Sequence, residues 1–334
     1  MSVMAANGRP ALKRWAVVLL AVLGLGLIAA PAIFQMFDRA PKGATMIAGF
    51  QPFMTDARMN SFKANIATIR DGVRQGDNGV ASYLDAADKA AFNRQYPAFA
   101  SFASEWGPID RDMVSMLDQM QAQIPNYEAV AALPNFKLFP WFFVIPGVIL
   151  LLLGGLAALR PSSWRWVRWV ALAIGVGLIL APAAFQMFER APKGAKMVAA
   201  FTEIETRPKV ETIQGYFGTI ASGQGSLRLD LIPALKQKGL TDRQIAERFP
   251  AVVALDRQWI PILQNLTPMI AAMSDNVVNY QAVAALPDFR LFPWFFVLPG
   301  IFVIALILLA GFRNARGASA DPEAQSTAKE KEVH

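Results

Sequence analysis

The 334-residue chain contains no cysteine, and its single histidine is His334. Without cysteine it has neither disulfide bonds nor a thiol nucleophile. One histidine at the last position assembles neither a Ser-His-Asp triad nor a histidine-ligated metal site. Phosphate-cradling glycine loops are also missing, because Gly24-Leu25-Gly26 lies in an apolar run without the rest of the dinucleotide fingerprint. The sequence therefore predicts a protein that is not an enzyme and binds no cofactor and no metal.

Charged residues are missing from four long windows of the chain. No Asp, Glu, Lys, Arg or His occurs in 15–37, 138–159, 169–188 or 291–312. A helix needs about 20 apolar residues to cross the hydrocarbon layer, and each window is long enough. None alternates as a barrel strand would. The windows predict four transmembrane helices, and they lack the charged residues typical of a proton or ion relay.

The first apolar run has features of a cleaved signal peptide, with Lys13-Arg14 before it and small residues at its exit. The same pattern recurs from Arg165 to Ala183, in the middle of the chain, where no signal peptide can stand. We therefore interpret the first run as an uncleaved signal anchor.

Two segments of the chain are repeated almost unchanged. Residues 30–50 return at 181–201 with 16 of 21 positions identical, and 126–147 return at 279–300 with 18 of 22 identical. The spacings are 151 and 153 residues, and each repeated segment borders an apolar window. The repeat predicts an all-α integral membrane protein formed by tandem duplication of one unit: transmembrane helix, extracytoplasmic helical bundle, transmembrane helix.

The predicted boundaries follow from the windows and the repeat. In chain order they are a cytoplasmic N-terminus at 1–14, a first transmembrane helix at 15–37, a first extracytoplasmic module at 38–137, a second transmembrane helix at 138–159, a cytoplasmic loop at 160–165, a third transmembrane helix at 166–188, a second extracytoplasmic module at 189–290, a fourth transmembrane helix at 291–312 and a disordered cytoplasmic tail at 313–334.

Basic residues on the short flanks set the predicted orientation. Eight of them occur there without any acid: Arg9, Lys13, Arg14, Arg160, Arg165, Arg168, Arg313 and Arg316. Such a bias predicts a multi-pass plasma-membrane protein with both termini in the cytoplasm. The outer segments are nearly balanced, with 10 basic and 11 acidic residues in 36–138. The net charge of +7 therefore favours contact with membrane lipids and does not indicate a nucleic-acid partner.

Helical periodicity dominates the outer segments. One apolar stripe comprises Met59, Phe62, Ile66, Ile69 and Val73, and a second comprises Ile109, Met113, Met116, Met120 and Ile124. Both follow the spacing of a helix face, and we expect the second helix to open after Gly107-Pro108. In the other copy, a last helix is expected from Trp259 to Val277. Each outer segment is predicted to form its own small helical bundle.

Two carboxylate pairs, Asp110 with Asp112 and Glu203 with Glu205, have the residue types needed for acid–base chemistry. We interpret both as solvated residues at helix starts. In the membrane helices, Gly24, Gly26 and Ala30 recur in the second copy. This predicts close helix packing, with a lipid or ligand slot as the alternative.

The residues retained best between the copies cluster where each helix meets the outer surface, and we call this region the outer collar. Its candidate binding residues are Arg39, Lys42, Arg190, Lys193, Trp141 and Trp294. One interpretation is anchoring, since Trp residues hold helices at the membrane interface. The other is that the basic residues hold an anionic headgroup or partner surface, with the aromatic residues beside its acyl chains.

The leading hypothesis is a non-enzymatic accessory, scaffold or sensor-like membrane protein. Its duplicated outer modules and collar would bind a partner protein, an envelope component or a lipid. The alternative is a transport or lipid-handling protein with a path between the two repeats. Polar residues for such a path are few, mainly Gln35 and Gln186.

Overall fold

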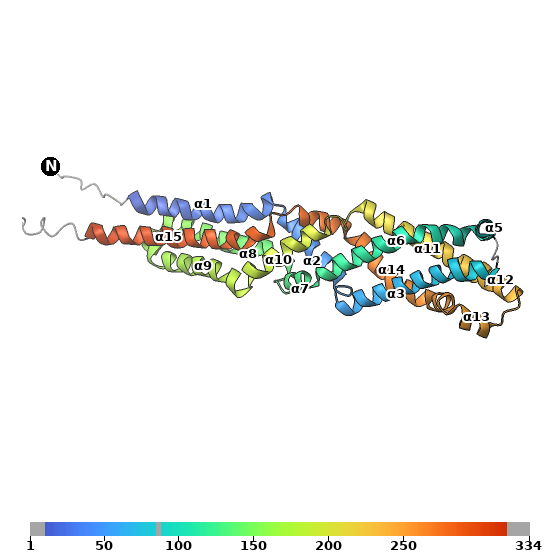
Figure 1. Ribbon diagram of the computed structural model, residues 1–334. Helices are drawn as coiled ribbons and strands as arrows, with labels where there is room; N and C mark the ends of the chain where they lie inside the picture. Colours follow the sequence, from blue (N-terminus) through green and yellow to red (C-terminus); the bar gives the residue numbers. More distant parts are fainter. Residues whose placement is uncertain (1–10, 85–87, 319–334) are drawn as a thin grey trace, which may run out of the picture. The chain divides into compact units, whose positions relative to one another are not determined.

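The computed structural model describes residues 11–84 and 88–318, and all regular structure in these ranges is helical (Figure 1). The α-helices are α1 (Ala11–Ile33), α2 (Met36–Phe50), α3 (Asp56–Arg74), α4 (Ala81–Leu84), α5 (Lys89–Gln95), α6 (Pro97–Ala122), α7 (Ile124–Ala131), α8 (Phe139–Leu159), α9 (Trp164–Ala184), α10 (Met187–Phe201), α11 (Arg207–Ser226), α12 (Ile232–Gln237), α13 (Asp242–Arg248), α14 (Pro250–Ala284) and α15 (Phe292–Ala318). Short π-helical or 3₁₀ turns are η1 (Gln75–Val80), η2 (Phe136–Leu138), η3 (Pro161–Ser163), η4 (Leu227–Leu231) and η5 (Phe289–Leu291).

The predicted terminal segments are covered only in part. Residues 1–10 and 319–334 lie outside the described residues. Residues 313–318, which the sequence assigned to a disordered tail, belong to α15.

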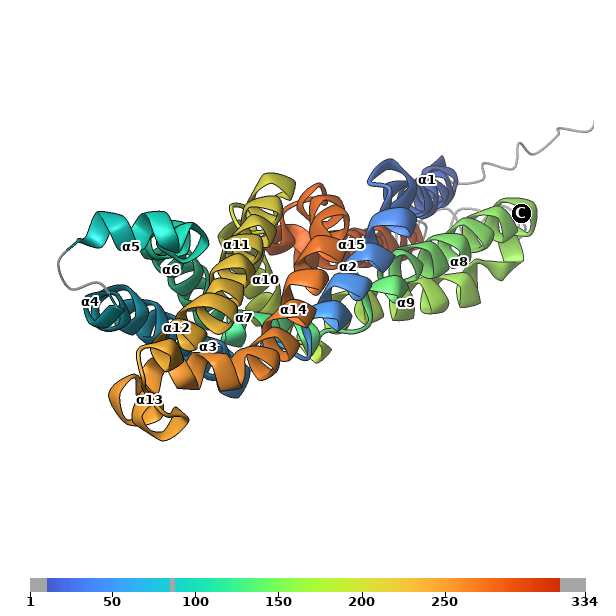
Figure 2. The same ribbon diagram turned by 90° about the vertical axis from the view of Figure 1, so that its right-hand side faces the viewer.

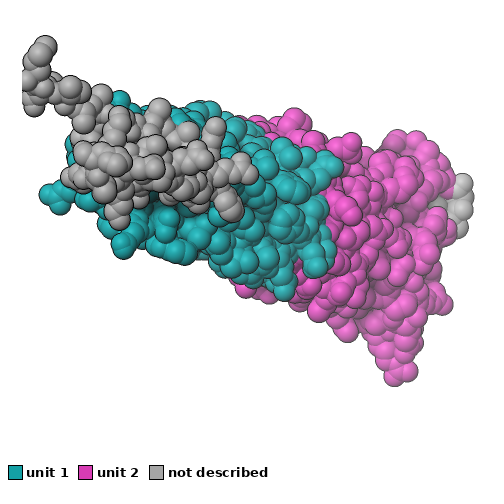
Figure 3. All heavy atoms as spheres, turned by 90° about the vertical axis from the view of Figure 1, so that its left-hand side faces the viewer, with its two compact units in different colours: residues 1–44, 132–195, 285–334 teal, residues 45–131, 196–284 magenta. Residues whose placement is uncertain are grey.

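The chain divides into two compact units, each formed from separate stretches of sequence (Figure 3). Unit 1 comprises residues 1–44, 132–195 and 285–334, and unit 2 comprises residues 45–131 and 196–284. The first part of α2 and of α10 therefore belongs to unit 1, and the remainder to unit 2.

Unit 1 contains the four apolar helices, which lie side by side in Figures 1 and 2. Within the described residues, four stretches are long and apolar enough to cross a membrane: Arg14–Ile33, Phe136–Leu159, Trp164–Ala184 and Phe289–Ala310. The prediction of four candidate membrane helices is confirmed. Helix α1 packs against α8 and α15, and α9 packs against α8 and α15, so that the four form a ring.

Glycines bring the helices of each pair close together. A Cβ atom built on Gly24 would lie 2.6 Å from the carbonyl oxygen of Gly147, and one on Gly300 would lie 2.7 Å from that of Gly175. Any larger residue would push the backbones apart, as the predicted small-residue packing requires. Gly26 behaves differently, because a Cβ there would meet no atom within 4 Å. The packing interpretation is therefore wrong for Gly26.

The outer ends of α1 and α9 differ from the predicted 15–37 and 166–188. Both helices stop at a left-handed residue: Gln35 and Gln186 each have a φ of 53°. A helix cannot pass through such a residue, so α2 and α10 start as new helices directly after it. Periodicity gave no sign of this break, since the apolar run continues through it.

Unit 2 is formed by residues 45–131 and 196–284 from both repeat copies, whereas the sequence predicted separate modules at 38–137 and 189–290. Its four long helices contact one another in a closed order, with α3 against α6, α6 against α11, α11 against α14 and α14 against α3. The apolar stripe of α3 explains why the two copies form one unit, because α3 packs against α6 from its own copy and against α14 from the other. Phe62 is fully buried, and a Cβ on Gly72 would lie 2.7 Å from the Leu255 side chain of α14.

Both predicted apolar stripes are buried, and α6, which carries most of the second stripe, starts earlier than expected. Helix α6 begins at Pro97 and continues through Pro108, because Phe99, Phe102 and Trp106 extend the same buried face. Burial of these rings offsets the backbone hydrogen bond that an internal proline removes. Helix α14 likewise runs unbroken through two internal prolines.

Candidate functional site

The outer collar lies in unit 1, and its two arginines bridge the two copies of the sequence repeat. Arg39 Nη1 donates to the carbonyl oxygen of Ala285 at 2.7 Å, and Arg190 Nη1 donates to that of Ala132 at 2.6 Å. Each guanidinium makes a second, longer contact of 3.4 or 3.5 Å with the carbonyl oxygen five residues before it. Both arginines therefore hold backbone carbonyls just after the ends of α14 and α7, through charge-assisted hydrogen bonds.

The collar lysines are in different surroundings. Lys42 Nζ contacts Asp38 Oδ2 at 2.7 Å, one helical turn away on α2. Lys193 is exposed and makes no side-chain hydrogen bond or ion pair with other residues in the described part of the chain. Three of the four basic collar residues thus already have a partner within the protein.

The two collar tryptophans make matching contacts. Trp141 packs edge-on against Phe37, with ring centroids 5.6 Å apart, and Trp294 packs edge-on against Phe188 at 5.9 Å. Their exposed fractions are 49% and 47%. Half-exposed indoles at the ends of apolar helices fit the anchoring interpretation.

A groove that the sequence did not predict lies beside one of these tryptophans. It has a volume of about 280 Å³ and is formed by α1, α15 and the turns next to them, with one residue each from α2 and α8. It is lined by Leu23, Gly26, Leu27, Ala30, Phe34, Met36, Phe143, Pro287, Phe292, Trp294, Phe295, Leu298 and Pro299.

The lining side chains of this groove are all apolar or carry a single indole N–H. The rings of two lining residues, Phe34 and Phe295, stack on each other with centroids 6.2 Å apart. Gly26 opens its floor, since no atom lies within 4 Å of a Cβ built there. Leu298 is 58% exposed on its rim. Gly26 thus matches the slot that the sequence offered as the alternative to packing.

The first carboxylate pair forms cross-links within unit 2. Asp110 accepts two hydrogen bonds from Arg70, of 2.7 and 2.9 Å. Asp112 accepts one from Lys209 at 2.5 Å and one from the Tyr216 hydroxyl at 2.9 Å. The two carboxylates therefore have different basic partners, and the prediction of simple solvated residues missed these ties between helices.

The two residues of the second carboxylate pair, Glu203 and Glu205, are in opposite environments. Glu203 is exposed, as expected, but Glu205 is only 2% exposed, so the interpretation of Glu205 as solvated is wrong. Burial raises the pKa of Glu205 to about 8 by desolvating its charged form. The signal that could have revealed this is the repeat itself, because the matching residue in the first copy is Met54.

No group of three or more Asp, Glu, His or Cys side chains among the described residues is placed to hold a metal ion. Comparison of the chain with protein-family models, curated proteins and solved structures yields no match.

Proposed function

We propose that this chain is a non-enzymatic, multi-pass membrane protein that binds a lipid, with a hydrocarbon chain lying in the groove beside Trp294. The observation that carries the proposal is the groove itself, about 280 Å³ in volume, apolar throughout and bordered by an interfacial indole. In this proposal the chain arose by tandem duplication and lies in the plasma membrane. Its termini are cytoplasmic and its outer segments extracytoplasmic.

A hydrocarbon chain is the occupant that suits this groove best. Most lining residues belong to two of the candidate membrane spans, Arg14–Ile33 and Phe289–Ala310. In a bilayer such a groove opens toward acyl chains. A polar ligand would lose its hydration there without gaining hydrogen bonds, at a cost of several kcal/mol. An acyl chain has no hydrogen bonds to give up on entering, and its close packing against the rings offsets the freedom of motion that it loses.

The hydrogen bonds of the collar arginines favour binding of an acyl chain over binding of a lipid headgroup. Arg39 and Arg190 already donate to backbone carbonyls, and a phosphate would have to compete with those bonds. We therefore assign specificity to the groove, with Trp294 at its outer end, and assign the arginines to holding the two copies together.

A photoreactive lipid tests this assignment. The full-length protein is reconstituted in phosphatidylethanolamine vesicles that contain phosphatidylglycerol with a diazirine on one acyl chain. After irradiation, peptides carrying Phe34 and Leu298 should be labelled several-fold more than the peptide carrying Leu152, which is also exposed on a membrane helix. Equal labelling of all exposed helix faces would mean that lipid only surrounds the protein, and would contradict the proposal.

A further inference from the structure

A second cavity lies within unit 2, and its lining follows the sequence repeat. Its volume is about 20 Å³, and its ten lining residues form five pairs at matching positions of the two copies. Four pairs are chemically alike, among them Phe50 with Phe201. The fifth sets Glu205 against Met54. The cavity therefore differs between its two halves by one carboxylate.

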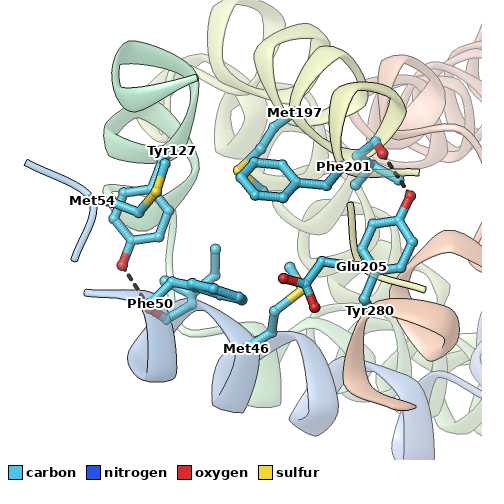
Figure 4. A pocket seen from close by; sticks show the side chains of 10 residues that line it. Met46, Phe50, Met54, Tyr127, Met197, Phe201, Glu205 and Tyr280 are labelled. Carbon is cyan, nitrogen blue, oxygen red and sulfur yellow. Dashed lines mark hydrogen bonds between the residues drawn. The ribbon is translucent and has the colours of Figure 1, made fainter. Parts of the chain in front are cut away.

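Glu205 has no partner for its charge. Its carboxylate points into the space between the labelled side chains in Figure 4. Both oxygens are buried without a hydrogen-bond partner among the described residues, and no basic side chain forms an ion pair with them. A buried carboxylate of this kind must be neutralised, either by a proton or by a cation that enters the cavity.

The remaining lining residues offer ring faces, thioethers and aliphatic groups, but no free hydrogen-bond donor. The Tyr127 hydroxyl donates to the carbonyl oxygen of Ile47 at 2.6 Å, and the Tyr280 hydroxyl donates to that of Val198 at 2.7 Å. These two tyrosines, from α7 and α14, are the other titratable side chains of the lining, while α2 and α10 contribute only apolar ones. The complementary ligand is therefore one that only donates hydrogen bonds.

Aromatic and thioether groups make the cavity favourable for a positive charge. The rings of Phe50 and Phe201 lie 6.2 Å apart, and ring faces attract cations within about 6 Å. The sulfur atoms of Met46 and Met197 add polarisable, weakly accepting groups. A cavity of this measure holds roughly one water molecule, which limits the charged group to about the size of ammonium.

We propose that this cavity binds a primary ammonium group, either ammonium itself or the –NH₃⁺ end of a small amine, with the Glu205 carboxylate as its counter-charge. The exchange is balanced: the protonated carboxyl releases its proton to solvent, and the ammonium group takes its place. Because proton and ammonium compete for one carboxylate, affinity should rise about tenfold per pH unit while Glu205 is still protonated, and then level off.

The first copy of the repeat supplies the control variant. Glu205→Met places in the second half of the cavity the residue that the first half already holds, so the fold should tolerate it. Glu205→Gln keeps the shape and removes only the charge. Both variants should lose ammonium binding while their thermal unfolding stays cooperative.

The experiment uses the full-length protein in mild detergent, with methylammonium nitrate as the probe and potassium nitrate at equal ionic strength as the control. Methylammonium should raise the unfolding temperature of the native protein, more at pH 8.5 than at pH 6.5, and leave both variants unchanged. Calorimetry at pH 7 should detect close to one proton released per methylammonium bound. The proposal is overturned if native protein and Glu205→Met respond alike, or if silver nitrate stabilises the protein through its methionines and methylammonium does not.

Discussion

Arg39 and Ala285 belong to different copies of the sequence repeat, and the guanidinium of the first donates to the carbonyl oxygen of the second at 2.7 Å. Arg190 makes the reciprocal bond to Ala132 at 2.6 Å. The two bonds tie the repeat copies together, because each arginine follows one apolar helix, α1 or α9, and bonds the chain just ahead of another, α15 or α8. This relationship gives the arginines a structural task that the neighbouring lysines do not share.

Replacing both arginines should therefore destabilise the protein. Arg39→Gln with Arg190→Gln removes the charge-assisted bonds, and each loss should lower the free energy of unfolding by about 1–2 kcal/mol. The matched control, Lys42→Gln with Lys193→Gln, should change it by less than about 0.5 kcal/mol. Thermal unfolding in detergent measures both. Equal stability of the two double variants would show that the arginine bonds contribute nothing.

The pKa of Glu205 predicts how stability depends on pH. Its folded-state pKa of about 8 lies above the ordinary value of 4.5, so the folded protein binds the proton more tightly than the unfolded chain. The contribution of this proton to the free energy of unfolding is greatest below pH 4.5. It is lost as the pH rises toward 8, by up to about 1.4 kcal/mol per pH unit. The difference in unfolding free energy between native protein and Glu205→Met should follow this course. A difference that is flat from pH 5 to 8 would mean that Glu205 is not buried.

Backbone strain at Gln35 predicts that a Gln→Gly substitution there affects stability differently from a Gln→Gly substitution inside a regular helix. Gln35 has a φ of 53°, which costs a non-glycine residue roughly 1 kcal/mol, so Gln35→Gly should leave stability unchanged or raise it. Gln214 is exposed in the middle of α11, and Gln214→Gly should lower stability by about 0.5–1 kcal/mol. If both variants lose stability equally, the break between α1 and α2 does not depend on the left-handed residue.

The proposed orientation is tested with a reporter that is active only in the cytoplasm. It should be active when inserted in the loop at 161–164, which lies between Arg160 and Arg165, and inactive when inserted at Gly239. Gly239 has a φ of 92° and lies in a turn between short helices of unit 2, so an insertion there should be tolerated. The reverse pattern of activity would invert the topology.

Local pattern was enough to predict the helical parts of this fold. The charge-free windows marked the four apolar helices, and the stripe through Phe62 and Ile69 marked a buried helix face. The structure departs from the prediction wherever distant parts of the chain meet. Prolines inside α6 and α14 are tolerated because neighbouring helices cover these helices, and periodicity along one segment carries no information on such cover.

The candidate sites show the same division. The collar tryptophans could be predicted from their residue type and their position at the ends of apolar windows. The hydrogen bonds of Arg39 could not, because they depend on how the two copies pack together. Glu205 looked like a solvated residue because it lies just ahead of a helix start, and its burial follows from packing among four helices. Aligning the copies residue by residue, with Met54 opposite Glu205, was the one available clue.

Lipid retention by a groove-filled variant tests the proposed function most directly. Gly26→Leu places a side chain in the groove, at a position where a Cβ meets no atom within 4 Å. Gly155→Leu adds the same side chain at an equally open position of α8 outside the groove. Native mass spectrometry of the proteins purified in mild detergent compares their bound lipid. The proposal predicts that native protein and Gly155→Leu retain a lipid, whereas Gly26→Leu loses most of it at unchanged thermal stability. Equal retention by all three proteins would contradict a lipid-binding groove.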